Sequence, residues 1–250
     1  MKKIIVRADD LGYSRGINYG IADSVKNGII RSVGVMVNMP DTEHGLALLK
    51  GVPVCYGLHT NICVGKPLTD PEKIPSLVDD QGNFKSSKVY RSAKEDFVVL
   101  EEVMLEIEAQ LDRFIELMGE HPHYFEGHAV MSTNFYRGLA TVAAKRDCDY
   151  LGPDFAGGFK FRNTNVVPVL ESMKTDYDPL GTLMACAVKE YPENTVPMMV
   201  CHPGYLDAYI MKTSSMLNPR VLEVEMACAQ NTKEWLIENK IELITYDDLT

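Results

Sequence analysis

Acidic and histidine side chains stand at the ends of several short apolar runs of this sequence. In chain order they are Asp9, Asp10, His59, Glu126, His128 and His202. Carboxylates and imidazoles are the side chains that bind catalytic metal ions and transfer protons. If the apolar runs are parallel strands, their carboxyl ends meet at one rim, and these side chains converge there. The residue types and their positions therefore predict an active site.

Taken singly, each of these residues has an ordinary structural explanation. An Asp-Asp pair followed by Gly12 is typical of a turn, and His202 lies in a His-Pro-Gly sequence that also suits a turn. A lone histidine at a strand end is more commonly a hydrogen-bonded structural residue than a metal ligand. The joint placement favours the functional interpretation, because independent turn or core residues need not all lie on one rim.

Two imidazoles and a carboxylate can form a metal site with open coordination positions, as catalytic hydrolytic sites do. We expect Asp10, His59 and His128 to be the ligands. Adjacent residues of a strand point to opposite faces, so only one of the two aspartates is expected to bind the ion. Asp9 is then left as a base that deprotonates a water molecule, and His202 as an acid that protonates a leaving group.

The elements that must position these residues alternate along the chain. Short β-branched runs and helical periodicities follow one another from end to end, which indicates parallel strands joined by crossover helices. We count seven or eight strand candidates. No G-x-G-x-x-G sequence or P-loop occurs, so nucleotide-binding open sheets lose their main support. The pattern favours an α/β fold in the form of an irregular (β/α) barrel over an open doubly wound sheet.

The individual elements follow from local periodicity and capping signals. Strands are expected at 2–8, 30–37, 52–60, 123–128, 148–151, 196–202 and 241–246. Helices are expected at 16–27, 42–50, 92–118, 134–145, 179–190 and 218–239. The helix at 92 would begin with a Ser92/Glu95 capping box, and the helix at 218 with Asn218 as N-cap. Residues 61–91 are expected to form a long loop excursion, and residues 152–163 a Gly/Phe-rich loop.

Length and composition set limits on the class of protein. With 250 residues, of which 46% are hydrophobic, we expect a single barrel domain over 1–250. A net charge of −10 lacks the basic footprint of a nucleic-acid or anionic-membrane partner. We find neither a signal-peptide h-region nor an apolar run of the ~20 residues that a membrane span requires. Six cysteines without a Cys-x-x-Cys pair indicate buried free thiols and a cytoplasmic location.

Five segments together resemble a known family, the YdjC-like carbohydrate deacetylases, which include chitooligosaccharide deacetylases acting on N-acetylated chitobiose and its phosphate. In order, the segments are Arg7–Gly12, Gly57–Asn61, Glu126–His128, Cys201–Tyr205 and Leu243–Leu249. The resemblance covers the chain from its first strand to its last. It implies an irregular (β/α) barrel related to polysaccharide deacetylases, a homodimer, and a divalent ion described as magnesium.

The resemblance also assigns roles to individual residues. It implies that Asp10, His59 and His128 hold the metal, that Asp9 is the general base and that His202 is the general acid.

The sequence departs from the family pattern at one place. Family members typically read Asp-x-His-x-His at the fourth strand, whereas this chain reads Glu126-Gly127-His128-Ala129-Val130. The second histidine is absent, and the acidic side chain is one methylene longer. If the missing histidine handles substrate or metal in the family, the departure affects activity or specificity here.

The function expected from these observations is a metal-dependent deacetylase. Its substrate would be the N-acetyl group of a short, chitobiose-like amino-sugar oligosaccharide, free or phosphorylated, and one product would be acetate. The cofactor would be one divalent ion. Magnesium follows from the resemblance, but two imidazole ligands suit zinc, manganese or cobalt at least as well, because magnesium prefers oxygen.

Three other functions stay open. A glycosidase that splits a phosphorylated disaccharide such as cellobiose phosphate would use two of the carboxylates Asp9, Asp10 and Glu126. Two histidines beside an aspartate favour a metal site over such a carboxylate pair. A metal-dependent phosphoesterase would need basic residues to bind a phosphate, and only Arg7 lies near the motifs. The altered fourth-strand motif supports a non-catalytic sugar-binding regulator.

Overall fold

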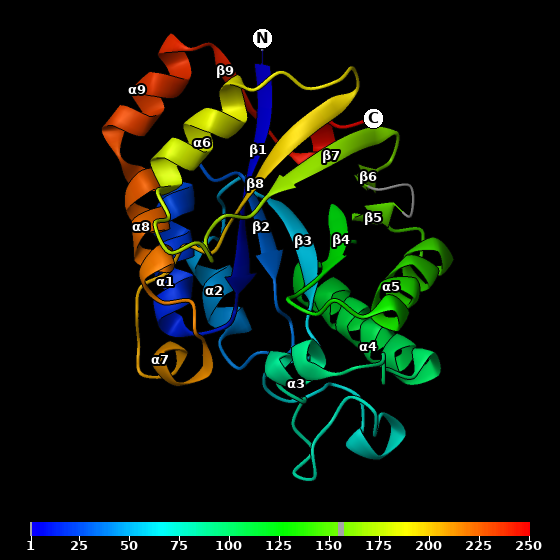
Figure 1. The fold of residues 1–250 in the computed structure, drawn as a ribbon. Helices are drawn as coiled ribbons and strands as arrows, with labels where there is room; N and C mark the ends of the chain where they lie inside the picture. Colours follow the sequence, from blue (N-terminus) through cyan, green and yellow to red (C-terminus); the bar gives the residue numbers. More distant parts are fainter. Residues whose placement is uncertain (1, 155–157) are drawn as a thin grey trace.

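The strands of the chain form one mixed sheet that curves into a nearly closed barrel (Figure 1). The structure is a computed structural model and describes residues 2–154 and 158–250. In these ranges the strands are β1 (Lys2–Leu11), β2 (Ser32–Val35), β3 (Cys55–Thr60), β4 (Tyr124–Gly127), β5 (Gly152–Asp154), β6 (Gly158–Phe161), β7 (Thr164–Val169), β8 (Thr195–Cys201) and β9 (Ile241–Ile244). Their order in the sheet is β4-β3-β2-β1-β8-β7-β6-β5, and β9 pairs with β1.

The two end strands of this order, β4 and β5, approach each other and nearly close the barrel. Phe125 of β4 forms a parallel bridge with Tyr150, and the Leu151 amide donates to the Phe125 carbonyl at 2.9 Å. The expected irregular barrel is therefore confirmed. It is not wholly parallel, because β6 runs antiparallel to both β5 and β7.

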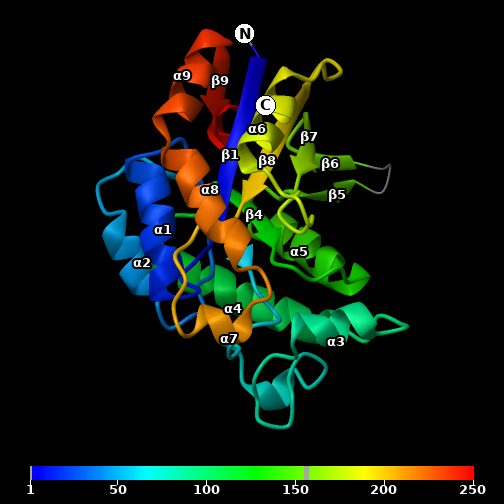
Figure 2. The ribbon, with the colours of Figure 1, turned by 60° about the vertical axis from the view of Figure 1, so that its left-hand side comes forward.

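Helices cover the outside of the barrel (Figures 1 and 2). They are α1 (Arg15–Lys26), α2 (Thr42–Leu48), α3 (Ser87–Ser92), α4 (Leu100–Met118), α5 (Thr133–Lys145), α6 (Pro179–Val188), α7 (Ile210–Thr213), α8 (Asn218–Cys228) and α9 (Gln230–Glu238), with short 3-10 helices η1 (Pro71–Lys73) and η2 (Tyr246–Asp248). Helix α1 packs against α2 and α8, and α4 packs against α5. In the described ranges no helix combines the length and the apolar character needed to cross a membrane.

Helix α1 illustrates how the sequence pattern becomes structure. The Ser14 hydroxyl caps its first turn by accepting from the Ile17 amide at 3.3 Å. Ile17, Ile21 and Val25, spaced four residues apart, are all buried against the barrel. Strand β1 is buried from Ile4 onward, as expected of a parallel strand that is covered on both faces.

The longest helix begins later than its expected start at residue 92. Ser92 ends α3, and α4 starts at Leu100 with Val99 as its N-cap, so the predicted capping box is wrong. The segment between α3 and α4 instead caps the first turn of α5. The Asp96 carboxylate accepts from the Ser132 hydroxyl at 2.9 Å and from the Asn134 amide at 2.9 Å, at the start of α5.

The helix expected over 218–239 is two helices. Ala229 between α8 and α9 has an extended backbone (φ −62°, ψ 139°). The Ala227 carbonyl, near the end of α8, accepts from the Ile29 amide at 3.1 Å. Asn218 lies within the helix, and the N-cap is Leu217.

Strands replace much of the loop expected at 152–163. The short strand expected at 148–151 begins instead at Gly152 as β5, and β6 follows it; residues 155–157 lie outside the described residues. Strand β7 has no counterpart in the expected elements. It contains Pro168, which is tolerated because the pairing of β7 with β6 ends at Val166.

The excursion at 61–91 is held by buried polar groups of α4. The Glu106 carboxylate accepts from the backbone amides of Leu68 at 3.1 Å and Thr69 at 2.8 Å. The Gln110 side chain donates to the Asn61 carbonyl at 2.6 Å and accepts from the Asn61 amide at 2.9 Å. The excursion is therefore fixed near the carboxyl end of β3.

Candidate active site

Asp9 and Asp10 lie in the last part of β1, and both are buried. Asp10 has a φ of +76°, and the pairing of β1 with β2 shifts register between Ala8 and Leu11. Such a bulge disrupts the usual alternation of side chains. Asp9 Oδ2 and Asp10 Oδ1 lie 4.0 Å and 3.4 Å from the same atom, His59 Nε2. The expectation that the two carboxylates point to opposite faces is therefore wrong.

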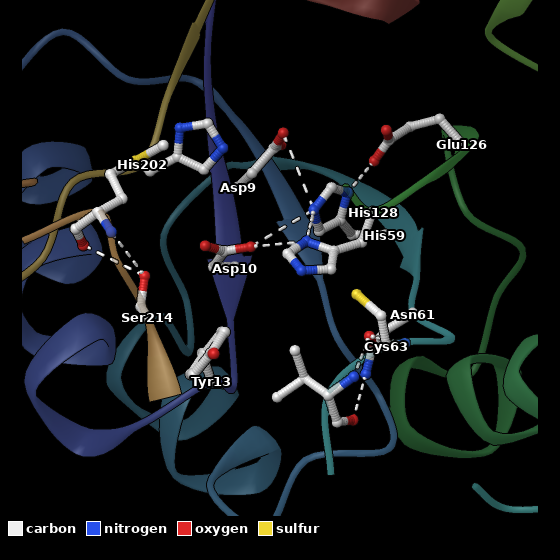
Figure 3. Close-up of polar contacts among 12 residues, drawn as sticks. Asp9, Asp10, Tyr13, His59, Asn61, Cys63, Glu126, His128, His202 and Ser214 are labelled. Atoms are coloured by element: carbon white, nitrogen blue, oxygen red, sulfur yellow. Dashed lines mark hydrogen bonds and ion pairs between the residues drawn. The ribbon is translucent and has the colours of Figure 1, made fainter. Parts of the chain in front are cut away.

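The two histidines come from the neighbouring strands. His59 is in β3, and His128 directly follows β4. His59 Nε2 lies 2.9 Å from His128 Nδ1, and Asp10 Oδ1 lies 3.2 Å from the same His128 nitrogen (Figure 3). Gly34 of β2 leaves room for this arrangement, because a Cβ there would lie 2.9 Å from Asp9 Oδ1 and 3.1 Å from the His59 Cβ.

The donor atoms of Asp10, His59 and His128 fit a single divalent cation. Two ligands that each lie ~2.1 Å from one ion are about 3.0 Å apart at a right angle and about 3.4 Å apart at the tetrahedral angle. The three distances among these donors are 2.9, 3.2 and 3.4 Å. Asp10 Oδ1 is buried and has no hydrogen-bond partner among the described residues. Oxygen and imidazole nitrogen are also suitable donors for zinc, manganese or cobalt.

A second group of donor atoms, from Asp9, His59 and Glu126, lies beside the first. Here the Arg7 guanidinium already supplies the positive charge. Its NH2 group lies 2.7 Å from Asp9 Oδ2 and 3.5 Å from Glu126 Oε2. In the first group Arg220 binds the other oxygen of Asp10, Oδ2, and leaves Oδ1, which faces the histidines, without a hydrogen-bond partner among the described residues, so the first group is the better cation site.

Glu126 orients His59. Its Oε1 contacts His59 Nδ1, so the other ring nitrogen, Nε2, faces Asp10 and His128. A carboxylate on the outer nitrogen of a ligating histidine fixes the ring and raises its basicity. Glu126 thus has a clear structural role at the position where the sequence departs from the family pattern.

Burial and charge act in opposite directions on the histidines. Burial lowers the pKa of His59, but the carboxylates of Glu126 and Asp9 outweigh it and hold that pKa well above the ordinary value. Burial likewise opposes protonation of His128, yet Cys63 and Asp10 raise its pKa to about 9. A cation would replace these protons, as metal binding to imidazole ligands generally does.

His202 lies directly after β8, on the side of the aspartates away from His59 and His128 (Figure 3). Burial lowers its pKa to about 4, so the ring is neutral near pH 7. Its Nδ1 is buried and has no hydrogen-bond partner among the described residues. The structure therefore brings all five sequence-predicted site residues to one end of the barrel.

Sequence reasoning missed the charged residues that support this group. Arg7 pairs with Asp9, and Arg220 of α8 donates to Asp10 Oδ2 at 2.8 Å. Glu223, also in α8, accepts from the His202 amide at 2.5 Å. A signal was present for Arg7, which is a charged residue inside an apolar strand. The helical pattern of α8 gives no comparable indication of which face meets the site.

Known proteins resemble this chain over nearly its whole length. A family model described as YdjC-like protein matches residues 3–238. Carbohydrate deacetylase 2 from Listeria innocua is 35% identical, and the alignment covers 99% of this chain and 98% of that protein. Chitooligosaccharide deacetylase from Klebsiella pneumoniae is 30% identical, with 98% of each chain covered.

A solved structure from Enterococcus faecalis has the same fold. It is described as a candidate for cellobiose-phosphate cleavage, and its TM-score with this chain is 0.81 at 23% identity, with 98% of each chain covered. At this level of identity the likeness concerns the fold.

Proposed function

Because the chain belongs to the YdjC-like protein family, we propose that it is a metal-dependent carbohydrate deacetylase. The reaction is hydrolysis of the N-acetyl group of a short amino-sugar oligosaccharide, with release of acetate. The single observation that carries the proposal is the close group formed by Asp10, His59 and His128, with Asp9 beside it. The names of the relatives, carbohydrate deacetylase and chitooligosaccharide deacetylase, support the same reaction class.

A divalent cation held by Asp10, His59 and His128 would polarise the acetamido carbonyl and stabilise the negative charge that develops on its oxygen. Asp9 takes the proton from the attacking water. Its Oδ2 is held by Arg7, whereas its Oδ1 has no hydrogen-bond partner among the described residues and is left to accept that proton.

His202 supplies the proton for the leaving amine. The ring is neutral in the free site, but negative charge on Asp10 and Asp9 favours its protonated form. Negative charge that develops on the substrate during the reaction would also favour the protonated form of His202. The neutral ring takes up one proton from solvent in the substrate complex. As the C–N bond breaks, His202 transfers that proton to the amine nitrogen, Asp9 releases the proton of the attacking water to solvent, and the products are acetate and a free amino sugar.

The glycosidase alternative fits the geometry less well. It needs two carboxylates that face the scissile bond. Glu126 is occupied by His59 and Arg7, and one oxygen of Asp10 is occupied by Arg220.

The non-catalytic alternative rested on the altered fourth-strand motif, yet Glu126 has a definite role in orienting His59.

The substrate and the dimer in this proposal rest on the family resemblance, and the location rests on the six cysteines without a Cys-x-x-Cys pair. We propose a chitobiose-like substrate, free or phosphorylated, a cytoplasmic location and a homodimer. Magnesium is the metal that the family resemblance implies, and zinc, manganese and cobalt are those that two imidazole ligands favour.

The reaction class is tested by identifying the products. Protein loaded in turn with Mg²⁺, Zn²⁺, Mn²⁺ or Co²⁺ is incubated with di-N-acetylchitobiose, and acetate and new reducing ends are both quantified. We expect acetate without new reducing ends. New reducing ends without acetate would favour the glycosidase, and sugar binding without either product would favour the regulator.

A further inference from the structure

The backbone of His202 leaves the sheet and takes its hydrogen bonds from α8. Strand β8 ends at Cys201, so the polar groups of the next residue need other partners. The His202 amide donates to Glu223 Oε2 at 2.5 Å, and the His202 carbonyl accepts from Arg220 NH1 at 3.3 Å. Arg220 and Glu223 are three residues apart and therefore lie on one face of the helix. Both polar backbone groups of His202 are thus held by α8.

The same arginine also holds Asp10. Arg220 NH2 donates to Asp10 Oδ2 at 2.8 Å, while its Nε donates to the Met216 carbonyl at 3.0 Å. The guanidinium carbon lies 5.8 Å from the centre of the Tyr13 ring. A guanidinium presents its donors in a rigid plane, so these contacts fix Asp10 and the His202 backbone relative to each other.

Glu223 is fixed on both of its oxygens. The side chain is fully buried, and the Tyr177 hydroxyl donates to Oε1 at 2.8 Å. Burying charged residues is often less favourable than burying apolar ones of the same size. Stability alone therefore gives little reason for two buried ionisable side chains on this face of α8.

We propose that Arg220 and Glu223, together called the α8 clamp, are positioning residues of the site. They hold the proton donor His202 and the metal ligand Asp10 in one frame, so that acid and cation stay at a fixed separation during the reaction. The inference rests on the proposed deacetylase function and extends it to two residues outside the predicted site.

The test compares clamp variants with Glu225→Ala, an exposed position on the same helix. Acetate release gives kcat and KM, and calorimetric titration with Mn²⁺ gives metal affinity. Glu223→Ala should lower kcat by about 10- to 100-fold, with metal affinity unchanged. Glu223→Gln should recover most of the activity, because its amide oxygen still accepts from the His202 amide. Arg220→Gln should lower both kcat and metal affinity, because it loses Asp10 as well.

A double-mutant cycle separates positioning from a purely structural role. If Glu223 acts through His202, adding Glu223→Ala to His202→Ala should lower kcat no further. Multiplicative losses would overturn the proposal. So would a Glu223→Ala protein that melts at a lower temperature but turns over normally when folded.

If the wild-type protein releases no acetate, the proposed function is rejected. The α8 clamp can still be tested in that case. Two measurements then test the clamp. They are the Mn²⁺ affinity of Arg220→Gln and the NMR chemical shift of the His202 amide in Glu223→Ala. Weakened binding and an upfield amide shift support the clamp. If both match the Glu225→Ala control, the clamp is rejected independently of the reaction.

Discussion

Asp9 and Asp10 are adjacent in sequence and differ in the arginine that binds each of them. Arg7 holds Oδ2 of Asp9, and Arg220 holds Oδ2 of Asp10. In each carboxylate this leaves Oδ1 buried without a hydrogen-bond partner among the described residues. Only Asp10 Oδ1 lies within 3.4 Å of both histidine nitrogens, which suits it to a cation and leaves Asp9 for proton transfer.

Replacing Asp9 should therefore impair turnover but not metal binding. Asp9→Asn keeps the shape of the side chain but removes its basicity, and we expect kcat for acetate release to fall by about 10²- to 10⁴-fold. Metal affinity, measured by calorimetry, should stay near the wild-type value. A loss of metal with kcat preserved would reverse the roles of the two aspartates.

Glu126 should matter through His59. Glu126→Ala frees the outer nitrogen of the ring, and we expect metal affinity to fall by about 10- to 100-fold. The measurement is a competitive titration against a chelator, with the exposed Glu120→Ala as control. Unchanged affinity would mean that His59 is oriented by other contacts.

Glu223 should make stability depend on pH. Burial raises its pKa from 4.5 to about 7. A raised carboxyl pKa means that the folded state binds the proton more tightly, so this contribution is present below pH 4.5 and is lost as pH rises through 7. Relative to Glu223→Gln, the wild-type free energy of unfolding should fall by at most about 3 kcal/mol between pH 4.5 and 8. The free energies of unfolding are measured by urea denaturation. If they changed by the same amount in the two proteins between pH 4.5 and pH 8, the raised pKa of Glu223 would be contradicted.

At the scale of elements, the sequence predicted the strands that carry the site. Strands β1, β3, β4 and β8 lie where apolar runs end in acidic or histidine residues. Such runs are informative because a buried parallel strand must be apolar on both faces. The bulge at Asp10 was not predicted, because it depends on how β1 pairs with β2 and leaves no mark in the period of the sequence.

The helix boundaries that failed did so for a related reason. Asp96 and Ala227 each bond to a distant segment, and such tertiary bonds override local capping and periodicity. For the same reason Arg220 and Glu223 could not be placed at the site. A helical pattern shows that a face is buried but not what that face touches.

The excursion at 61–91 should depend on Glu106 of α4. Glu106→Ala removes the acceptor for the partly buried Leu68 and Thr69 amides, and leaving a fully buried donor unpaired costs about 1–3 kcal/mol, which is an upper bound here. We expect faster proteolytic cleavage within 61–91 than in Glu101→Ala, an exposed change on the same helix. Equal cleavage rates would show that apolar contacts alone hold the excursion.

At the scale of the whole molecule, the last segment of the chain supports the first strand. The Tyr246 hydroxyl accepts from Arg7 NH1 at 3.0 Å, and its ring stacks on Tyr124 with centroids 3.9 Å apart. Arg7 in turn holds Asp9. Motifs at opposite ends of the sequence therefore act on one group of side chains, which is why the motifs span the chain.

We propose that residues 1–250 form one domain, and thermal unfolding tests this. Since the first and last strands pair and share a core, we expect one calorimetric transition whose calorimetric and van't Hoff enthalpies agree. Two separated transitions would indicate two folding units.

The most direct test of the metal-dependent deacetylase is a titration of chelator-treated protein with Mn²⁺, following acetate release from di-N-acetylchitobiose. We expect the rate to rise from near zero to a plateau at one ion per chain in the wild type. The exposed His121→Ala variant should behave in the same way, and His128→Ala should stay inactive at that ratio. Acetate release that needs no metal, or that persists unchanged in His128→Ala, would contradict the account.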